Sequence, residues 1–485
     1  MRFSVITALA LTTLSSVLAF SPSFPYGKRK VRGVNLGGWL VLEPWISPSI
    51  FDNTGNPDII DEWTFGLYQN PDVALATLQK HWDTFITEDD FAAISAAGLT
   101  HVRLPIGHWA FEVSDSEPYI QGQLPYVFKA IEWAEKYDLH VILDLHSTPG
   151  SQNGFDNSGQ RLDTGPNWHR RKENIARTNK ILKQIVATFQ NETTVADTIA
   201  PLNEPAGFFG QLILNVTKQY WLDSYQSIRY PEGDSTKSDL LVLIHDTFQG
   251  ISYWNGFMSA PQYEGVGIDT HVYQMFNDQT VRLNDTGHIQ QACSSAKDIQ
   301  SAVNMYVIVG EWTPSFHDCA KYLNGLGRGA RYDGTLTTPK VGDCQNITGH
   351  AEYFSPEYKE FLRKMWEAQV ISFESGAGWI QWTWKAEAAD EWSYQAGLKH
   401  GWIPKDPTDL KYPDICSSLT AAKDTSKDVS KDVPKASTKN ISKEATKETS
   451  EESTKEETEE AGAAPAKDGE VKGHRDRYKR RTLRR

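Results

Sequence analysis

Two glutamates stand at positions where a carboxylate is costly to bury without a purpose. Glu204 is the last but one residue of the apolar segment Ile199–Pro205. Glu311 directly follows the apolar run Val307–Gly310. A charged side chain leaves water at a high cost unless it is paired or used. One such glutamate is compatible with a structural ion pair. Two of them across a pocket suit glycosidic-bond hydrolysis, in which one carboxyl is protonated and the other ionised.

The elements that must position these glutamates are short apolar segments. Several are near-continuous runs of Val, Ile and Leu, which is typical of strands buried on both faces of a parallel sheet. The predicted strands are Arg32–Trp39, His101–Gly107, His140–His146, Ile199–Pro205, Asp239–Asp246, Gly265–Tyr273, Tyr306–Trp312 and Gly378–Trp384.

Helical patterns lie between several of these strands. Examples are Val127–Tyr137, Lys172–Phe189 and Pro356–Ala368, the last with Ser355 as a plausible N-cap and Pro356 as the first helical residue. Eight strand-then-helix units in about 390 residues predict an α/β protein, a (β/α)8 TIM barrel with long loops.

Active residues of such a barrel lie at the carboxyl ends of its strands, and polar residues of this chain fall there. Glu204 and Glu311 are 107 residues apart, or three units of about 35 residues, which places them on strands four and seven. A metal site of His146 and His271 with Asp144 is the alternative, but the compact ligand spacing of a metal motif is missing. We expect neither a metal nor a cofactor.

At this point the sequence resembles a known family. Asn203-Glu204-Pro205 looks like the acid/base motif of glycoside hydrolase family 5. The wider set resembles the fungal exo-β-1,3-glucanases of that family, over about Val31 to Cys416. The motifs are RGVNLGGWLVLEPW (Arg32–Trp45), HVRLPIG (His101–Gly107), LDLHSTPGSQNGFDNSG (Leu143–Gly159), HVYQMF (His271–Phe276), VGEWT (Val309–Thr313) and WTWKAEAADEWSYQ (Trp382–Gln395).

The resemblance implies a role for each residue of the site. Glu204 is acid/base and Glu311 nucleophile, and Arg103 with Tyr273 would keep Glu311 ionised while the charge of Glu311 raises the pKa of Glu204. The remaining roles concern the sugar: Asn203 and His146 contact it at the cleavage position, His271 lies near the acid/base, Glu43 and Asp156 bind hydroxyls at the blocked end, Trp382 is the platform, and Phe155 and Phe276 clamp the next sugar. Trp384 shares the strand face of Trp382 by period-two alternation, so the choice of Trp382 follows the family pattern.

Composition divides the chain into parts. Residues 1–19 have the charge, apolar run and small terminal residues of a signal peptide, and Lys28-Arg29 makes 20–30 a possible pro-segment. Residues 31–416 form the predicted hydrolase domain. Residues 417–485 hold 17 basic and 14 acidic residues and few large apolar ones, so a disordered tail is expected. The remainder then carries a net charge of −16, which argues against a nucleic-acid partner.

Cysteines and sequons fit an exported protein. The cysteines lack CxxC spacing, which favours two disulfides with three possible connectivities; the family pattern implies Cys293 with Cys416 and Cys319 with Cys344. Glycosylation candidates are Asn191, Asn215, Asn284, Asn346 and Asn440. The sixteen tryptophans are candidates either for core packing or for stacking on sugars.

These observations lead to one hypothesis with open alternatives. We expect a secreted monomer, extracellular or in the cell wall and without a membrane anchor. The resemblance implies that the protein releases glucose from the non-reducing ends of β-1,3-glucan with retention. Some relatives also transfer the glucosyl group to another sugar, so transglycosylation is possible here as well. An endo-acting or β-1,6-specific glucanase on the same barrel is the enzymatic alternative. A catalytically inactive wall-glucan-binding protein is the other.

Overall fold

The computed structural model describes residues 20–233 and 237–418. Within them, parallel strands close into a barrel in chain order, β1 pairing with both β2 and β8. The strands are β1 (Val31–Asn35), β2 (His101–Ile106), β3 (His140–Leu145), β4 (Thr198–Ala200), β5 (Leu241–His245), β6 (Val266–Val272), β7 (Tyr306–Trp312) and β8 (Gly378–Gln381). The predicted barrel is confirmed, and each predicted strand contains or overlaps one of these strands.

Three strands end at least three residues earlier than predicted. β1 ends at Asn35, β4 at Ala200 and β8 at Gln381. In each case the apolar run continues past the last ladder bond, because the chain at the mouth of the barrel stays buried after it leaves the sheet. Burial alone therefore predicts where a strand lies better than where it ends.

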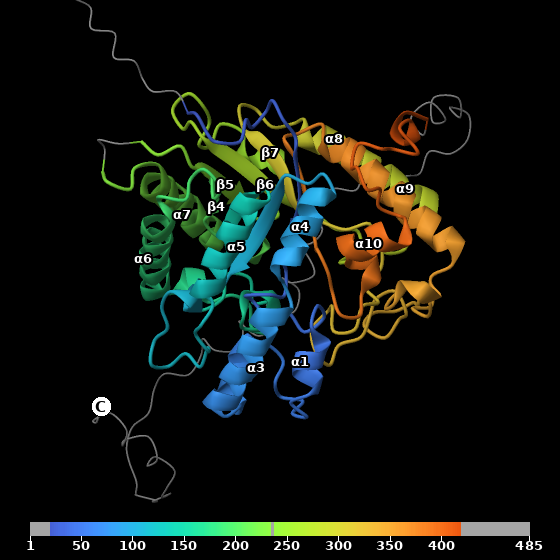
Figure 1. The fold of residues 1–485 in the computed structure, drawn as a ribbon, viewed down its shortest axis with the longest axis horizontal. Coiled ribbons are helices and arrows are strands. Elements are labelled where there is room, and N and C mark those ends of the chain that lie inside the picture. Colours follow the sequence, from blue (N-terminus) through green and yellow to red (C-terminus); the bar gives the residue numbers. More distant parts are fainter. Residues whose placement is uncertain (1–19, 234–236, 419–485) are drawn as a thin grey trace, which may run out of the picture. The chain divides into compact units, whose positions relative to one another are not determined.

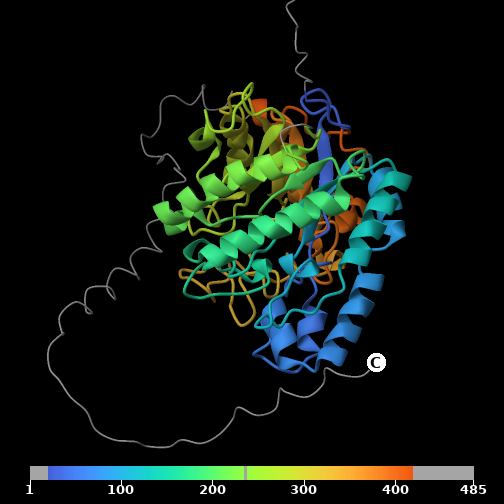
Figure 2. The same cartoon turned by 90° about the vertical axis from the view of Figure 1, so that its left-hand side faces the viewer.

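Helices cover the barrel, and Figure 2 shows α6 and α7 side by side on one flank. The predicted helix at α6 has the right bounds, and α9 begins at Pro356 with Ser355 accepting from the Tyr358 N–H as predicted. The α-helices are α1 (Pro48–Asp52), α2 (Glu62–Tyr68), α3 (Pro71–Thr84), α4 (Glu88–Ala96), α5 (Leu124–Lys136), α6 (Lys172–Phe189), α7 (Gln211–Arg229), α8 (Asp285–Ile299), α9 (Pro356–Phe373) and α10 (Tyr394–His400). The 3-10 helices are η1 (His108–Ala110), η2 (Asp156–Ser158), η3 (Trp168–Arg170), η4 (Gly207–Phe209), η5 (Ile251–Trp254), η6 (Ala351–Tyr353) and η7 (Asp390–Trp392).

The fifth unit departs from the predicted strand-then-helix repeat. Between β5 and β6 the only helix in the described chain is η5, a 3-10 helix of four residues. This connection is short and is interrupted by Gly250, Gly256 and Pro261. Glycine and proline interrupt helices, so this connection joins β5 to β6 without an α-helix.

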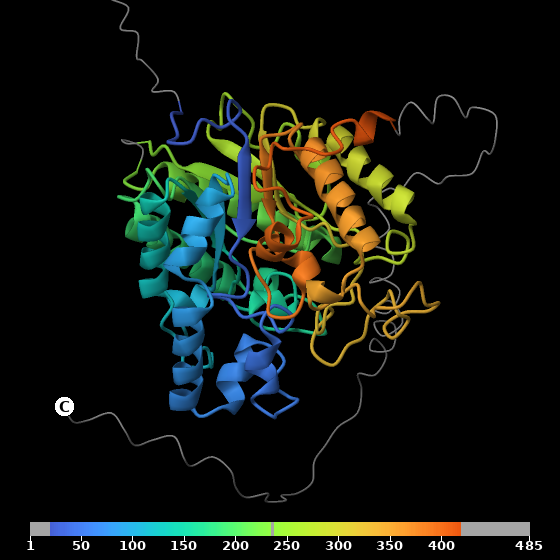
Figure 3. The ribbon, with the colours of Figure 1, turned by 45° about the vertical axis from the view of Figure 1, so that its right-hand side comes forward.

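Long connections gather at the carboxyl end of the barrel. Helices α1 to α4 follow β1, and Figures 1 and 3 show α1 and α3 on the same side as the loops after β7. The expected two disulfides are both formed. Cys319–Cys344 closes the loop after β7, and Cys293–Cys416 ties the end of the described chain to α8.

Most tryptophans belong to the core. Twelve of the sixteen have less than 2% of their surface exposed, so packing and not sugar stacking accounts for most of them. No helix among the described residues is long and apolar enough to cross a bilayer.

The amino end of the barrel is closed by residues that precede β1. Figure 1 shows this blue segment at the end of the barrel opposite α1 and α3. Phe24 is fully buried and packs with Val31, Ile142 and other strand residues. The Tyr26 hydroxyl donates to Asp197 (2.9 Å) and lies 2.6 Å from the Thr198 hydroxyl. Residues 20–30, predicted as a possible pro-segment, thus contribute side chains to the floor of the barrel.

Removing residues 20–29 should therefore destabilise the barrel. Each of the two aromatic side chains contributes about 1.5–3 kcal/mol by burial, and 1 kcal/mol shifts the melting temperature of a large domain by about 2–4 °C. A chain that begins at Lys30 should melt at least about 5 °C below one that begins at Phe20, as measured by calorimetry. Lys28→Ala, at an exposed position of the same segment, is the control and should melt like the parent chain. Equal melting of the two chain lengths would contradict a structural role.

Candidate active site

The centre of the barrel mouth is organised around the buried guanidinium of Arg103 on β2. Its Nη1 donates to Asn35 Oδ1 (2.9 Å) and to Glu311 Oε1 (2.8 Å), and its Nη2 donates to Asn203 Oδ1 (2.7 Å). Asp144 Oδ2 lies 3.2 Å from the same Nη2. One side chain thus connects residues of β1, β3 and β7 with Asn203, three residues beyond the end of β4.

The nucleophile candidate, Glu311, is held on β7 by two donors. Besides Arg103, the Tyr273 hydroxyl donates to its Oε2 (3.0 Å). Tyr273 directly follows β6, so register with β7 brings its ring to Glu311. Asp269 accepts the Gly310 N–H (2.8 Å) and fixes the backbone before Glu311. Both oxygens of Glu311 are therefore engaged and their directions are set.

The acid/base candidate, Glu204, lies four residues beyond the end of β4. Its φ of 45° is in the left-handed region, which is strained for a residue other than glycine. The neighbouring backbone holds this bend: the Asn203 N–H donates to Leu145 O (2.9 Å), and Gln152 Nε2 donates to Asn203 O (3.0 Å). The turn brings Glu204 toward the carboxyl ends of β6 and β7.

His271 lies between the two carboxylates. Its Nδ1 is 2.7 Å from Glu204 Oε1 and 3.4 Å from Glu311 Oε2, so these two oxygens are at most 6.1 Å apart. A separation of about 5–5.5 Å between the carboxyl groups is typical of retaining glycosidases, and about 6.5–9.5 Å of inverting ones. The bound of 6.1 Å applies to one oxygen pair and is compatible with the retaining geometry.

The three groups share their protons as one unit. The pKa of His271 is raised well above its ordinary value: burial lowers it, but Glu311, Asp269 and the bond to Glu204 outweigh burial. The pKa of Glu204 is lowered, because the hydrogen bond and charge of His271 outweigh burial. The pKa of Glu311 is raised by burial, which His271 and Arg103 offset only in part.

These shifts run opposite to those expected from the sequence. That expectation considered only the mutual repulsion of the two glutamates and the attraction of Arg103 for Glu311. It omitted a histidine within hydrogen-bonding distance of Glu204. A raised pKa of His271 beside a lowered pKa of Glu204 favours the proton on the imidazole, 2.7 Å from Glu204.

Two further predicted residues are oriented by the same network. Asn203 Nδ2 lies 3.3 Å from His146 Nε2, and His146 Nδ1 lies 2.6 Å from Asp144 Oδ2. Because Asp144 accepts the proton of Nδ1, the Nε2 lone pair of His146 faces Asn203. The Asn203 amide thus points its oxygen to Arg103 and its nitrogen into the site.

Glu43 lies near the carboxylate pair, and Asp156 lies near Glu43. Burial raises the pKa of Glu43 well above its ordinary value, Trp45 lowers it, and the charges of Glu311, Asp156 and Glu204 raise it further. Trp45 Nε1 donates to Glu43 Oε2 (2.9 Å). Burial also raises the pKa of Asp156 to about 6, and its Oδ2 is buried without a hydrogen-bond partner. Both carboxyls are suited to bind hydroxyls.

The structure separates the two tryptophans that follow β8. Trp382 lies at the mouth, its ring nearly parallel to that of His146 with centroids 5.6 Å apart. Gly37 makes room for it, because a Cβ there would come within 2.7 Å of the indole. Trp384 instead donates to Asp90 of α4 (2.8 Å) and is fully buried. The predicted shared face is wrong, because β8 ends at Gln381 and its alternation ends there.

The two predicted clamp residues are exposed. Phe155 and Phe276 are 41% and 42% exposed, so neither is a core residue. Phe276 packs edge-on against Tyr273 (5.4 Å), which bonds to Glu311. Phe155 lies two residues before Asn157, whose Nδ2 donates to Glu204 Oε2 (3.3 Å). Phe276 is therefore linked through Tyr273 to Glu311, and Phe155 is linked through Asn157 to Glu204.

Asn35, Asp269 and Asn157 belong to the site but were not among the predicted residues. Asn35 and Asp269 lie within quoted or neighbouring strand segments, yet their types do not separate them from structural polar residues. Asn157 lies in the quoted motif Leu143–Gly159 and its contact with Glu204 depends on the loop conformation. A polar residue at a buried strand end was the signal available for Asn35.

Two groups of described residues have metal-ligand atoms within 4.8 Å of one another: Glu204 with His245 and His271, and His350 with Glu352 and Asp390. In the first group, His245 Nδ1 accepts the Thr247 N–H (2.9 Å). A neutral His245 therefore carries its proton on Nε2, and His271 Nδ1 is already engaged by Glu204. These contacts fit a hydrogen-bonding role better than a ligand set.

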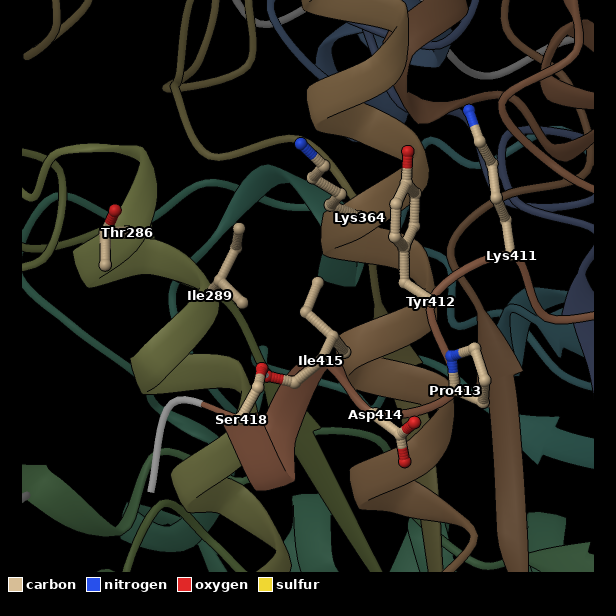
Figure 4. A pocket seen from close by; sticks show the side chains of 9 residues that line it. All are labelled: Thr286, Ile289, Lys364, Lys411, Tyr412, Pro413, Asp414, Ile415 and Ser418. Carbon is tan, nitrogen blue, oxygen red and sulfur yellow. Dashed lines mark hydrogen bonds between the residues drawn. The ribbon is translucent and has the colours of Figure 1, made fainter. Parts of the chain in front are cut away.

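Two surface hollows lie outside the carboxylate site. Figure 4 shows one of about 400 Å³ beside α8, α9 and the last described residues, with Lys364, Tyr412 and Ile415 in its lining. The second, of about 350 Å³, is lined by Phe85, Lys385 and neighbours. Neither lining includes Glu204 or Glu311.

Comparison with known proteins agrees with this geometry. The model of the family described as cellulase (glycosyl hydrolase family 5) matches residues 68–324, which include both candidate glutamates. A glucan 1,3-beta-glucosidase of Blumeria graminis is 43% identical over 402 residues, 82% of this chain and 92% of that protein. A probable glucan 1,3-beta-glucosidase A of Aspergillus niger is 42% identical over 399 residues, with the same two shares.

Among solved structures, the rutinosidase from Aspergillus niger has a similar fold. Its TM-score is 0.61 at 20% identity, covering 78% of this chain and 99% of that one. At this identity the likeness extends to the fold alone.

Replacing Arg103 by alanine should leave Glu311, Asp144 and Asp269 buried without their countercharge. We expect the free energy of unfolding to fall by about 3–5 kcal/mol at neutral pH. The pKa of Asp269 is lowered, because His271 and Arg103 outweigh burial. Such a carboxylate stabilises the fold above its unfolded-state pKa, and this is lost as pH falls through its folded pKa. The deficit of Arg103→Ala should therefore shrink below about pH 4 in denaturant titrations.

Arg229→Ala is the matched control. Arg229 is also fully buried, but it donates to the backbone carbonyls of Ser238 and Leu240, which do not titrate. Its titrating neighbour Glu264 is held chiefly by Lys237, so the deficit of Arg229→Ala should shrink much less with acid. If the Arg103→Ala deficit were equally independent of pH, the carboxylates would not be what Arg103 stabilises.

Proposed function

Because the chain belongs to glycosyl hydrolase family 5, we propose that it is a retaining glucan 1,3-β-glucosidase that releases glucose from the non-reducing ends of β-1,3-glucan. The observation that carries the proposal is the pair Glu204 and Glu311, joined through His271 and at most 6.1 Å apart at the nearest bridged oxygens. The names of the relatives supply the glucan and its linkage.

Glu311 is the proposed nucleophile. Its carboxylate attacks the anomeric carbon, a C–O bond to Glu311 forms, and the glycosidic C–O bond breaks. Arg103 and Tyr273 hold the two oxygens of Glu311, which supports this role because the attacking oxygen must be fixed in direction. Substrate that displaces water from the site strengthens both contacts.

Glu204 is the proposed acid/base. The proton held on His271 passes along the 2.7 Å contact to Glu204, which delivers it to the leaving oxygen. Once Glu311 is esterified, its negative charge is gone and the pKa of Glu204 falls further. Glu204 then takes the proton of an incoming water, which attacks the anomeric carbon and frees Glu311.

Burial of the carboxylates is compatible with action at chain ends. The side chains of Glu204 and Glu311 are only 8% and 6% exposed. Glu43 and Asp156 supply hydroxyl-binding groups beside them, Asn203 and His146 contact the sugar being cleaved, and Trp382 lies under it. If Glu43 and Asp156 bind the hydroxyls of the outermost sugar, a terminal sugar fits this site better than the middle of a chain.

Secretion is proposed from the sequence and from surface features. The expected signal peptide lies outside the described residues, as do Asn440 and the expected tail from residue 419 onward. The other four sequon asparagines are exposed, and both disulfides suit an oxidising compartment. A monomeric enzyme acting on glucan outside the cell or in the wall accords with these features.

Products of laminarin hydrolysis test the proposal. Glucose should be the only low-mass product from the earliest times, and NMR should detect the β-anomer first, because two inversions at the anomeric carbon give net retention. Mixed oligomers would indicate an endo-acting enzyme, and glucose from β-1,6-glucan alone would indicate the other linkage. Binding without hydrolysis would indicate an inactive glucan-binding protein, and α-glucose appearing first would refute retention.

Separate variants of the two glutamates should fail in different ways. Glu311→Ala should abolish hydrolysis but accept azide or an α-glucosyl fluoride. Glu204→Ala should lose about 10²–10⁴-fold on laminarin. It should still react with a substrate whose leaving group needs no proton, and azide should restore its second step with β-configuration. Glu391→Gln, a buried carboxyl outside the site, is the control. If all three variants lost activity and azide restored none of them, the losses would reflect structural roles.

A further inference from the structure

A row of phenylalanines continues outward from the mouth of the site. The ring of Phe155 is nearly parallel to that of Phe208, with centroids 6.4 Å apart and planes at 26°. Phe208 in turn contacts Phe209 at 5.0 Å. Phe155 and Phe209 are 41% and 39% exposed. We call Phe155, Phe208 and Phe209 the aromatic row.

The row is supported from behind. A Cβ at Gly165 would come within 2.8 Å of the Phe209 ring, so that ring rests directly on the loop that carries Phe155. Phe208 packs against Phe248, which follows β5, at 5.5 Å. Loops after β3, β4 and β5 therefore hold the rings in place, while Phe155 and Phe209 stay partly exposed.

The row lies on the side of the site where the leaving part of a substrate would be. Phe208 is four residues after Glu204 in the same connection, and Phe155 is two residues before Asn157, which bonds to Glu204. Glu204 is the group that protonates the leaving oxygen in the proposed reaction. We expect a chain attached through that oxygen to leave Glu204 on the side of the row.

The chemistry of the row suits a sugar chain. Exposed apolar rings gathered beside a binding site mark a ligand contact, because water covers such surface poorly. One face of a β-glucose ring presents only C–H groups, which pack on an aromatic face while the hydroxyls at the rim stay in water. Stacking of this kind needs no exact register, so it tolerates successive units of one polymer.

We propose that Phe208 and Phe209 extend the clamp of Phe155 into a platform that holds the β-glucan chain beyond the first sugar at the entrance. The platform increases the preference of the enzyme for long chains over short ones. This proposal rests on the proposed function, since it names the same polymer.

Phe209→Ala tests the platform with least risk to folding, because the ring is exposed. The specificity constant kcat/KM on laminarin should fall by about 5–30-fold, the loss of one stacking contact, chiefly through a higher KM. The value for laminaribiose and for an aryl β-glucoside should change less than twofold, because neither reaches Phe209. Tyr353→Ala, which removes an exposed ring on η6, is the control and should change none of these values.

Two results would overturn the platform. One is an unchanged kcat/KM of Phe209→Ala on laminarin, and the other is an equal loss on the aryl glucoside, which would mean that Phe209 merely positions Glu204. Calorimetric binding of laminarihexaose to Glu311→Ala, with and without Phe209→Ala, separates platform from function. A parent enzyme inactive on laminarin contradicts the proposed function, whereas equal hexaose binding by both variants contradicts the platform alone.

Discussion

The guanidinium of Arg103 is the group on which the geometry of the mouth depends. A buried cation is stable only where its surroundings return the hydration it has lost. Asn35, Asn203, Glu311 and Asp144 do so at 2.7–3.2 Å, from four different strands or strand ends. Satisfying one charge therefore fixes the relative positions of these strand ends. The same contacts direct Glu311 and orient Asn203, so the stability of the fold and the order of the site share one interaction.

Arg103 does not neutralise all the carboxylates of the site, and His271 lies among those that remain. Glu204, Glu311 and Asp269 all influence its pKa, and an imidazolium between them reduces their repulsion. A proton held on His271 can reach Glu204 across a single hydrogen bond. The proposed acid step then depends on a coupled pair and not on one carboxyl. The left-handed backbone of Glu204 is consistent with this demand, because strain is tolerated where a side chain must be aimed.

Sequence patterns predicted the part of this structure that follows from burial and repetition. Continuous apolar runs located the strands, and spacing placed Glu204 and Glu311 on opposite units of a barrel. The patterns did not predict where β8 ends, so Trp384 was placed on the wrong face. They did not predict the missing helix after β5. The pKa directions failed because they depend on the distance from His271 to Glu204, which no spacing along the chain contains. Tryptophan content was a poor guide to sugar contacts, since most of these rings fill the core and the exposed rings at the mouth are phenylalanines.

The two kinds of contact in this site suit two different tasks. Inside the barrel mouth, directional hydrogen bonds from Asn203, His146, Glu43 and Asp156 would distinguish hydroxyls and fix one sugar relative to Glu311. Outside it, the aromatic row offers contact that is apolar and without direction. An enzyme that removes sugars one at a time must let the shortened chain advance after each release. Directional contacts along the whole chain would hold every unit in one register and oppose that advance. Stacking on Phe155, Phe208 and Phe209 would retain the chain while it moves. The change from polar to aromatic contacts at the mouth therefore follows from one requirement: one sugar must be bound firmly and the others loosely.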